Sequence, residues 1–271
     1  MPALDPTLLT SEIGCYSCLG IPNEEAFKLG LLSRIASGGA PIPPPVIPSI
    51  VLTDLVLMTS AVAGVSFVTA IYTPAANSLL LAIVINEAAS FLTPASLVGN
   101  GLTWVLVKTI GTIVGKNGFV LSVYRAMGNA PSAGALTVNF VNGSPQDSCI
   151  CRVIQFSNVD TIGVNGSGAI VQSAQASVLQ ANPRTLNLAA MNLSGRNAVI
   201  SFGANSINPY GLVSKVGWTN DFDTGVTGSL MPISGSGTYQ LNSVDNAISL
   251  TGTVSGLSIF CSLIAAEIKA I

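Results

Sequence analysis

The hydrophobic pattern divides the chain into a short part with helical spacing and a long part with strand spacing. Near the N-terminus, Phe27, Leu31 and Ile35 recur at intervals of four residues, which is typical of one face of an α-helix. The pair Asp5 and Pro6 predicts an earlier helix start, because Asp caps a helix and Pro suits its first turn. From about residue 50 onwards, short apolar runs alternate with small polar residues, which is typical of β-strands.

The long part predicts an antiparallel β-sandwich or jelly roll. Its strand-length runs are rich in β-branched residues and fall at residues 78–85, 103–109, 119–124, 136–141, 149–156, 198–203, 247–254 and 257–269. Asn-Gly occurs at 100–101, 117–118, 142–143 and 165–166, and this dipeptide is favoured in tight hairpin turns that need positive φ. No tandem sequence repeat of fixed period is evident. The length suits one large β domain with a small appendage, or at most two modest domains.

These patterns predict three parts: a helical attachment segment at 1–36, a Pro/Gly-rich linker at 37–49 and a β-sandwich display domain at 50–271. The prolines of the linker end the helix and favour polyproline II, which makes a semi-rigid spacer. A PxxP ligand is the alternative, but no basic residue flanks the prolines to orient a docking partner.

The attachment segment has an apolar face and too little sequence to bury it in a core of its own. We therefore expect this segment to bind another protein, copies of itself or the main domain. The residues expected to anchor it are Leu8, Leu9, Cys15, Cys18, Phe27, Leu31 and Ile35.

Charge is scarce along the whole chain. Charged residues make up 8% of the sequence, against about 25% in an ordinary soluble domain, and the net charge is -2. The mean hydropathy is +0.63. Such a surface is explained most simply if much of it lies against other subunits, so we expect a homo-oligomer. The ten Lys and Arg residues form no basic stripe, which argues against nucleic-acid binding.

One stretch, residues 55–72, is free of charge for eighteen residues and is long enough to test as a membrane span. Its Thr, Ser and Gly residues dilute the hydrophobicity, and its second half is rich in β-branched and aromatic residues. We therefore expect strands here and no membrane insertion. The first residues lack the basic and apolar regions of a signal peptide, which predicts synthesis in a cytoplasm.

The chemistry available to the chain is limited, because it contains no histidine. This removes Ser-His-Asp and Cys-His arrangements and the commonest metal ligand. Cys15 and Cys18 have the spacing of half a zinc site or of a redox pair, but no second ligand pair is present. Cys149 and Cys151 are expected to be buried thiols, with an intersubunit metal or disulfide as the alternative. We expect no catalytic residue, metal or cofactor.

Two further groups of residues leave alternatives open. Asp221 and Asp223, with Asp245 as a third member, are explained by turn chemistry, by a calcium site or by a catalytic carboxylate pair. Trp104 and Trp218 either pack in the core or present their rings to a saccharide.

The order of segments resembles β-sandwich domains that are frequent in bacteriophage virion proteins. The resemblance covers most of the chain. It rests on residues 73–81, 101–104, 121–126, 137–140 and 153–160 and on the apolar closing run at 261–269. The run Cys-Tyr-Ser-Cys-Leu-Gly at 15–20, followed by an amphipathic helix, is similar to the leader of some phage structural proteins.

The resemblance implies a virion component made in the host cytoplasm, without defined catalytic residues. It implies a capsid decoration protein, head fibre or tail fibre, trimeric, with its N-terminal segment docked on phage capsid or tail proteins. The alternative is a tail-associated receptor-binding or carbohydrate-binding module that uses Trp104 or Trp218 on a host surface glycan. An enzyme such as a polysaccharide lyase or hydrolase is a third possibility.

Overall fold

We analysed a computed structural model, which describes residues 48–89, 92–114, 117–141, 144–179, 184–189, 196–206, 211–213, 215–252 and 260–271. These residues are mainly β and form antiparallel sheets. Their one helical element is a 3₁₀ turn, η2 (Ser167–Ala169). The predicted attachment segment at 1–36 and most of the predicted linker lie outside the described residues, so the N-terminal helix stays a prediction.

The first half of the body, residues 51–157, contains two sheets. The inner sheet has the order β1-β9-β3-β7-β6, and the outer sheet has the order β2-β8-β4-β5. The strands are β1 (Val51–Ser60), β2 (Ser66–Val68), β3 (Leu79–Ala88), β4 (Ser96–Gly99), β5 (Leu102–Thr103), β6 (Val105–Val114), β7 (Asn117–Ala126), β8 (Thr137–Asn139) and β9 (Ser148–Ser157).

The second half, residues 170–268, is organised in the same way. Its inner sheet has the order β10-β17-β12-β15-β14, and its outer sheet has the order β11-β16-β13. The strands are β10 (Ile170–Leu179), β11 (Arg184–Asn187), β12 (Ala198–Asn205), β13 (Leu212–Val213), β14 (Thr219–Thr227), β15 (Pro232–Gln240), β16 (Ala247–Gly252) and β17 (Phe260–Ile268).

The two halves share one topology, except that the short strand β5 has no counterpart among the described strands of the second half. In the inner sheets β1, β9, β3, β7 and β6 correspond to β10, β17, β12, β15 and β14, and the outer sheets correspond through β2, β8 and β4 with β11, β16 and β13. Even a β-bulge is repeated, since one register shift lies between Leu106 and Lys108 in β6 and the other between Asn220 and Phe222 in β14. The body is therefore a structural duplication that the sequence did not reveal.

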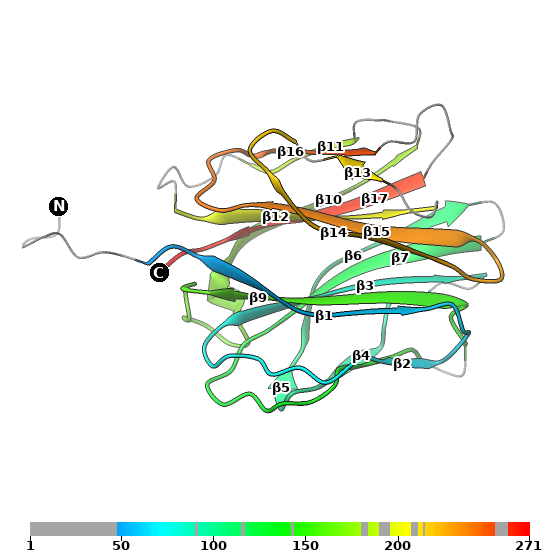
Figure 1. Cartoon of the computed structure of the whole chain (residues 1–271), viewed down its shortest axis with the longest axis horizontal. Helices are drawn as coiled ribbons and strands as arrows, with labels where there is room; N and C mark the ends of the chain where they lie inside the picture. Colours follow the sequence, from blue (N-terminus) through cyan, green and yellow to red (C-terminus); the bar gives the residue numbers. More distant parts are fainter. Residues whose placement is uncertain are drawn as a thin grey trace, which may run out of the picture. The chain divides into compact units, whose positions relative to one another are not determined.

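The halves pack against each other through their inner sheets, so that the sheets form layers with the two outer sheets on the outside (Figure 1). Strand β6 lies against β10 and β17, and its counterpart β14 lies against β1 and β9. Each of these contacts thus has a reciprocal, as in a two-fold dimer interface. The two halves of the chain are thus arranged like the two subunits of a homodimer.

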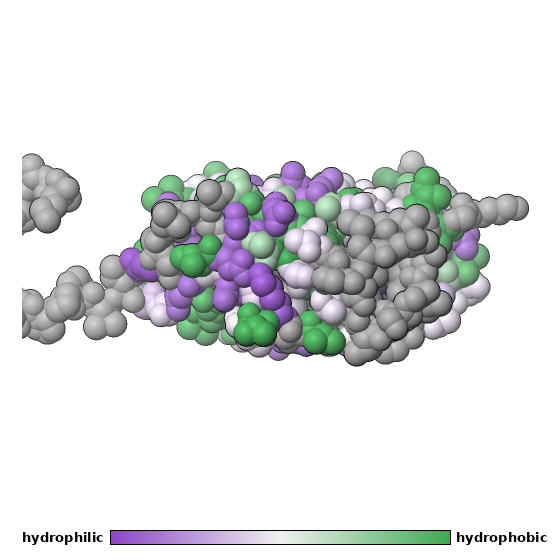
Figure 2. All heavy atoms as spheres, turned by 90° about the horizontal axis from the view of Figure 1, so that it is seen from above, coloured by the Kyte–Doolittle hydropathy of each residue, from purple (hydrophilic) through white to green (hydrophobic). Residues whose placement is uncertain are grey.

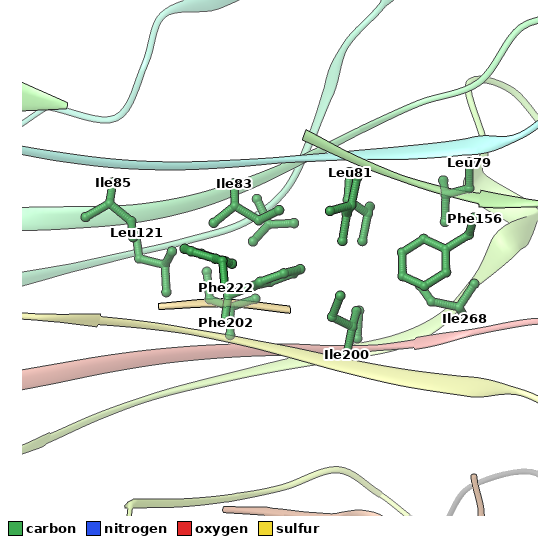
Figure 3. Close-up of a cluster of buried hydrophobic side chains, with 14 of the residues drawn as sticks. Leu79, Leu81, Ile83, Ile85, Leu121, Phe156, Ile200, Phe202, Phe222 and Ile268 are labelled. Carbon is green, nitrogen blue, oxygen red and sulfur yellow. The ribbon is translucent and has the colours of Figure 1, made fainter. Parts of the chain in front are cut away.

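A shared hydrophobic core joins the inner sheets. Leu79, Leu81, Ile83 and Ile85 of β3 point towards Ile200, Phe202 and Phe222 of the second half (Figure 3). These side chains alternate along β3 with Leu80, Ala82 and Val84, which pack under the outer sheet of the first half in a separate core. A third core, which includes Leu186, Trp218, Ile248 and Leu263, lies under the outer sheet of the second half. Strand β3 is thus covered by a hydrophobic core on each face. This explains the continuous apolar run at 79–85.

Several strand predictions are confirmed, including those at 78–85, 119–124, 149–156 and 198–203. The Asn-Gly pair at 100–101 forms the tight turn between β4 and β5, with φ of 58° and 65°. The pair at 165–166 also has positive φ, but it precedes η2 instead of joining a hairpin. The hairpin prediction at 117–118 was wrong, because Asn117 already pairs with Val114 inside the β6–β7 ladder.

The apolar stretch at 55–72 belongs to strands. It contributes the second part of β1 and all of β2. Within the part of the chain that the structure describes, no helix has the length and hydrophobicity needed to cross a membrane.

Candidate functional site

One polar cluster lies in the contact between the two halves. Arg152 of β9 places Nη2 2.5 Å from Oδ1 of Asp54 on β1 and 2.9 Å from Oδ1 of Asp221 on β14. The guanidinium group also lies 5.9 Å from the ring centroid of Phe222. The Asp221 side chain is fully buried, whereas the Asp54 side chain is 60% exposed. Arg152 thus connects a buried carboxylate of one half with a solvated carboxylate of the other.

Burial raises the pKa of Asp221 to about 6, although the hydrogen bond and charge of Arg152 act in the opposite direction. Burial alone would lower the pKa of Arg152, but Asp221 and Asp54 outweigh it and raise that pKa. The guanidinium group therefore stays charged, and its positive charge offsets part of the free-energy cost of burying the Asp221 carboxylate.

This cluster has no polar counterpart at the equivalent place in the duplication. The bulge residue Asp221 corresponds to Val107 in β6, and Arg152, which pairs with Ile83, corresponds to Ile264, which pairs with Phe202. Val107 and Ile264 both belong to the shared apolar core. The contact between the halves is therefore polar on one side and apolar on the other.

A second polar cluster lies where β3 ends and β9 begins. Glu87 and Asp147 lie beside Gly228, where an added Cβ would come within 2.9 Å of Glu87 Oε2 and 2.3 Å of Asp147 Oδ2. Ser229 and the backbone N–H of Leu230, from the turn between β14 and β15, donate hydrogen bonds to Asp147. Asp147 thus connects the β14–β15 hairpin of the second half to the first half, and Glu87 lies beside this contact.

The two carboxyl groups of this cluster titrate differently. Burial raises the pKa of Glu87 to about 8, helped by the hydrogen bond to Asp147 and its charge. Burial also acts to raise the pKa of Asp147, but the hydrogen bonds from Ser229 and Leu230 outweigh it and lower that pKa. Near neutral pH the pair therefore shares one proton, which Glu87 carries.

We expect Glu87→Gln to flatten the dependence of stability on pH. The pKa of Glu87 in the folded protein lies above its ordinary value, so its stabilising contribution is complete below the ordinary value and is lost as the pH rises through about 8. Urea unfolding should give a wild-type midpoint that falls between about pH 6 and pH 9, and a smaller fall for the variant.

Asp160→Asn is the matched control, because hydrogen bonding to Lys269 lowers the pKa of Asp160 and its titration lies below this range. Equal slopes for the wild type and Glu87→Gln would contradict the shared proton.

The acidic residues singled out in the sequence do not converge on one site. Asp221 lies between the inner sheets, whereas Asp245 accepts hydrogen bonds from Lys215 (2.5 Å) and from Trp218 Nε1 (3.1 Å) beside the outer sheet of the second half. Within the described residues, no group of three or more Cys, Asp or Glu side chains is placed to hold a metal ion. Asp221 and Asp245 therefore act in separate structural contacts, and the turn interpretation of Asp221 is replaced by a bulge in β14.

The two tryptophans occupy equivalent positions, each directly before the strand that carries the repeated bulge. Trp218 is 6% exposed and lies in the core under its outer sheet, with Lys215 Nζ 5.7 Å from its ring centroid. Trp104 is partly buried and packs on the corresponding core of the first half. The burial of Trp218 agrees with the core-packing alternative and gives no support to an exposed saccharide platform.

Cys149 and Cys151 are both buried in the core of the first half. Burial raises the pKa of Cys151 to about 12 and that of Cys149 well above its ordinary value, so both stay neutral thiols. The predicted anchor residues, Leu8, Leu9, Cys15, Cys18, Phe27, Leu31 and Ile35, lie outside the described residues.

The outer sheets of the two halves differ in charge. Near the second outer sheet, Lys215 and Asp245 form an ion pair, and hydrophilic side chains gather among hydrophobic ones on this side (Figure 2). The segments that build and surround the first outer sheet, at 61–86, 88–107 and 126–146, contain no Asp, Glu, Lys or Arg. The uncharged outer layer of the first half is the candidate interaction surface of the body.

Sequence reasoning missed Arg152, Asp54, Glu87 and Asp147. Arg152 carried a usable signal, because it is the only charge in the predicted strand at 149–156 and a buried charge requires a partner. Comparison with protein-family models, with curated proteins and with solved structures finds no match for this chain.

Proposed function

We propose that this chain is a non-enzymatic structural protein of a phage particle, a capsid decoration or fibre protein. In this proposal, residues 1–36 attach it to the particle and the β body is displayed. Each half is then a jelly roll, an architecture known from viral capsid and lectin domains. This is supported by the path of the chain, which alternates between the inner and outer sheet from β1 to β4 and again from β7 to β9.

The observation that carries the attachment model is where the chain enters the body. Asn158 donates a side-chain hydrogen bond to Ser49 O at 2.7 Å, and its backbone carbonyl accepts one from the N–H of Ile271. The first described residues and the C-terminus therefore meet at the same end, on the left of Figure 1. The loops at the opposite ends of the strands are then available for display while residues 1–47 connect to the particle.

The scarcity of charged residues supports a body that packs against other subunits. Four described carboxyl groups have structural partners: Asp54 and Asp221 bind Arg152, Asp160 binds Lys269, and Asp245 binds Lys215. The alternative of a carbohydrate-binding module relied on an exposed tryptophan, and the burial of Trp218 gives it no support.

The attachment model predicts complete loss of particle incorporation when charge is placed on the apolar face of the leader. Phe27→Asp and Leu31→Asp, each in the full chain, should leave the β body folded but absent from purified particles. The measurement is mass spectrometry of purified particles, with circular dichroism of the isolated protein as the folding check.

Lys28→Glu, which changes a charge in the same segment but not its apolar face, serves as the matched control and should be incorporated normally. Normal incorporation of both Asp variants would refute attachment through this segment. Absence of the wild-type chain from particles would refute the proposed function itself.

A further inference from the structure

The uncharged outer layer of the first half presents exposed apolar side chains in a regular pattern. One row of paired residues across β2, β8 and β4 is buried. It consists of Phe67, Val138 and Leu97, which belong to the core of the first half. On the opposite face, Val68 pairs with Thr137, and Thr137 pairs with Val98. Val68 and Val98 are each 58% exposed. An outward-facing row Val-Thr-Val therefore crosses β2, β8 and β4, and Thr103 of β5 pairs with Val98 and continues the row at one end.

A second outward-facing row lies two residues away from the first on each of the three strands. It consists of Ser66, Asn139 and Ser96. Ser66 donates a hydrogen bond to Asn139 Oδ1 at 3.1 Å, and Asn139 Nδ2 contacts Ser96 at 3.4 Å. Over the three strands β2, β8 and β4, both rows are thus symmetric in residue type about β8, with valine on both sides of threonine and serine on both sides of asparagine.

We propose that a second copy of this chain docks on this face, sheet to sheet, about a two-fold axis parallel to β8. Such an axis places β8 opposite β8 of the partner and β2 opposite β4 of the partner. Val68 of each copy then faces Val98 of the other, and Ser66 faces Ser96. The face is complementary to itself without any change of side chain, as an isologous interface requires.

Because the segments that build this face contain no charged residue, we expect the surface that docks on it to be uncharged as well. A charged partner would lose hydration at this face and find no opposite charge in return. The second outer sheet of the same chain is a poorer match, because it lies beside the Lys215–Asp245 ion pair. The adjoining segments also contain exposed apolar side chains, namely Val62, Val65, Ile71 and Val141.

This inference rests on the assembly role that the proposed function gives to the body and specifies the homo-oligomer expected from the sequence, but it does not depend on attachment to a particle. The full chain is expected to form dimers that dissociate on dilution, because three short strands with their loops make a small interface. Sedimentation velocity at about 1 to 100 µM should show monomers converting to dimers. Val98→Lys should abolish the dimer over this range, because each dimer would bury two unpaired charges.

Val213→Lys is the matched control, because Val213 is an exposed valine on the outer sheet of the second half. It should leave the dimer intact. Val68→Asp should be monomeric alone and should form a heterodimer when mixed with Val98→Lys, because the introduced carboxylate of one copy then faces the introduced ammonium group of the other. Circular dichroism should show all variants folded, since the substituted side chains point to solvent.

The possible results test the docking face, self-association in general and attachment to the particle separately. If Val98→Lys leaves the wild-type assembly unchanged, whether dimer or trimer, the proposed face is wrong while self-association stands. If the wild type stays monomeric at every concentration, both the face and self-association are wrong. Neither result affects the test of particle attachment with Phe27→Asp and Leu31→Asp.

Discussion

Arg152→Ala is expected to destabilise the folded body by about 3–5 kcal/mol at neutral pH. The substitution leaves the fully buried Asp221 carboxylate without its cation and Asp54 without its bridge to the second half. Burial already raises the pKa of Asp221 to about 6, and removing Arg152 should raise it further. The loss should therefore be smaller at about pH 5, where Asp221 takes up a proton, than at about pH 8. Guanidinium unfolding at the two pH values measures the difference.

The duplication supplies a matched rescue for this variant. Arg152→Ile combined with Asp221→Val copies the apolar pair Ile264 and Val107 found at the equivalent place. We expect the double variant to be within about 1 kcal/mol of the wild type, because replacing a whole buried ion pair by apolar groups is often neutral. Asp54→Asn should cost at most about 1 kcal/mol, because Asp54 is mostly solvated. A double variant as unstable as Arg152→Ala would show that the ion pair is not the source of the loss.

Phe202→Ala is expected to cost about 3–5 kcal/mol, because it removes a fully buried ring from the core that the two halves share. The side chain projects from β12 towards β3 of the first half (Figure 3). Since both inner sheets lose contacts, the variant should lower the stability of both halves together. Its effect should not be confined to the half that carries the substitution.

The two tryptophans allow each half to be followed separately, because Trp104 lies in the first half and Trp218 in the second and no other tryptophan is present. Fluorescence of Trp218→Phe reports the first half, and fluorescence of Trp104→Phe reports the second. In both backgrounds, Phe202→Ala should shift one common unfolding transition to lower denaturant. Separate transitions for the two reporters would mean that the halves fold independently and that the shared core couples them weakly.

Strands with apolar residues on both faces could be predicted from the sequence. Residues 79–85 and 149–156 are rich in Leu, Ile and Val, because β3 and β9 are central strands covered by a core on each side. Strands β10 and β15 could not be found in this way. Strand β10 is built from Gln, Ser and Ala and is ordered by pairing with β17. Propensity is weak for such residues, and cross-strand contacts decide their conformation.

Strand β15 could not be recognised in the sequence, because glycines such as those in its run Ser-Gly-Ser-Gly are typical of turns. In the fold these glycines make room for Phe222 on the neighbouring strand. A Cβ on Gly235 would come within 2.9 Å of the Phe222 ring, and one on Gly237 within 2.8 Å. The ring fills the space that side chains on β15 would otherwise occupy. The glycines are therefore a packing feature, which becomes visible only when the two strands are side by side.

The sequence by itself determined the β class of the body, the positions of its central strands and the scarcity of charge, because these properties depend on composition and local periodicity. Only the tertiary structure decided that the body is a duplication, that Arg152 meets Asp54 and Asp221, and that one outer layer is uncharged. These features join residues far apart along the chain, and the equivalent positions carry different residues, such as Val107 and Asp221. The two halves share strand order and packing, while side chains at equivalent positions such as Val107 and Asp221 differ, and the matching pair Trp104 and Trp218 is too small a signal to reveal the symmetry in the sequence.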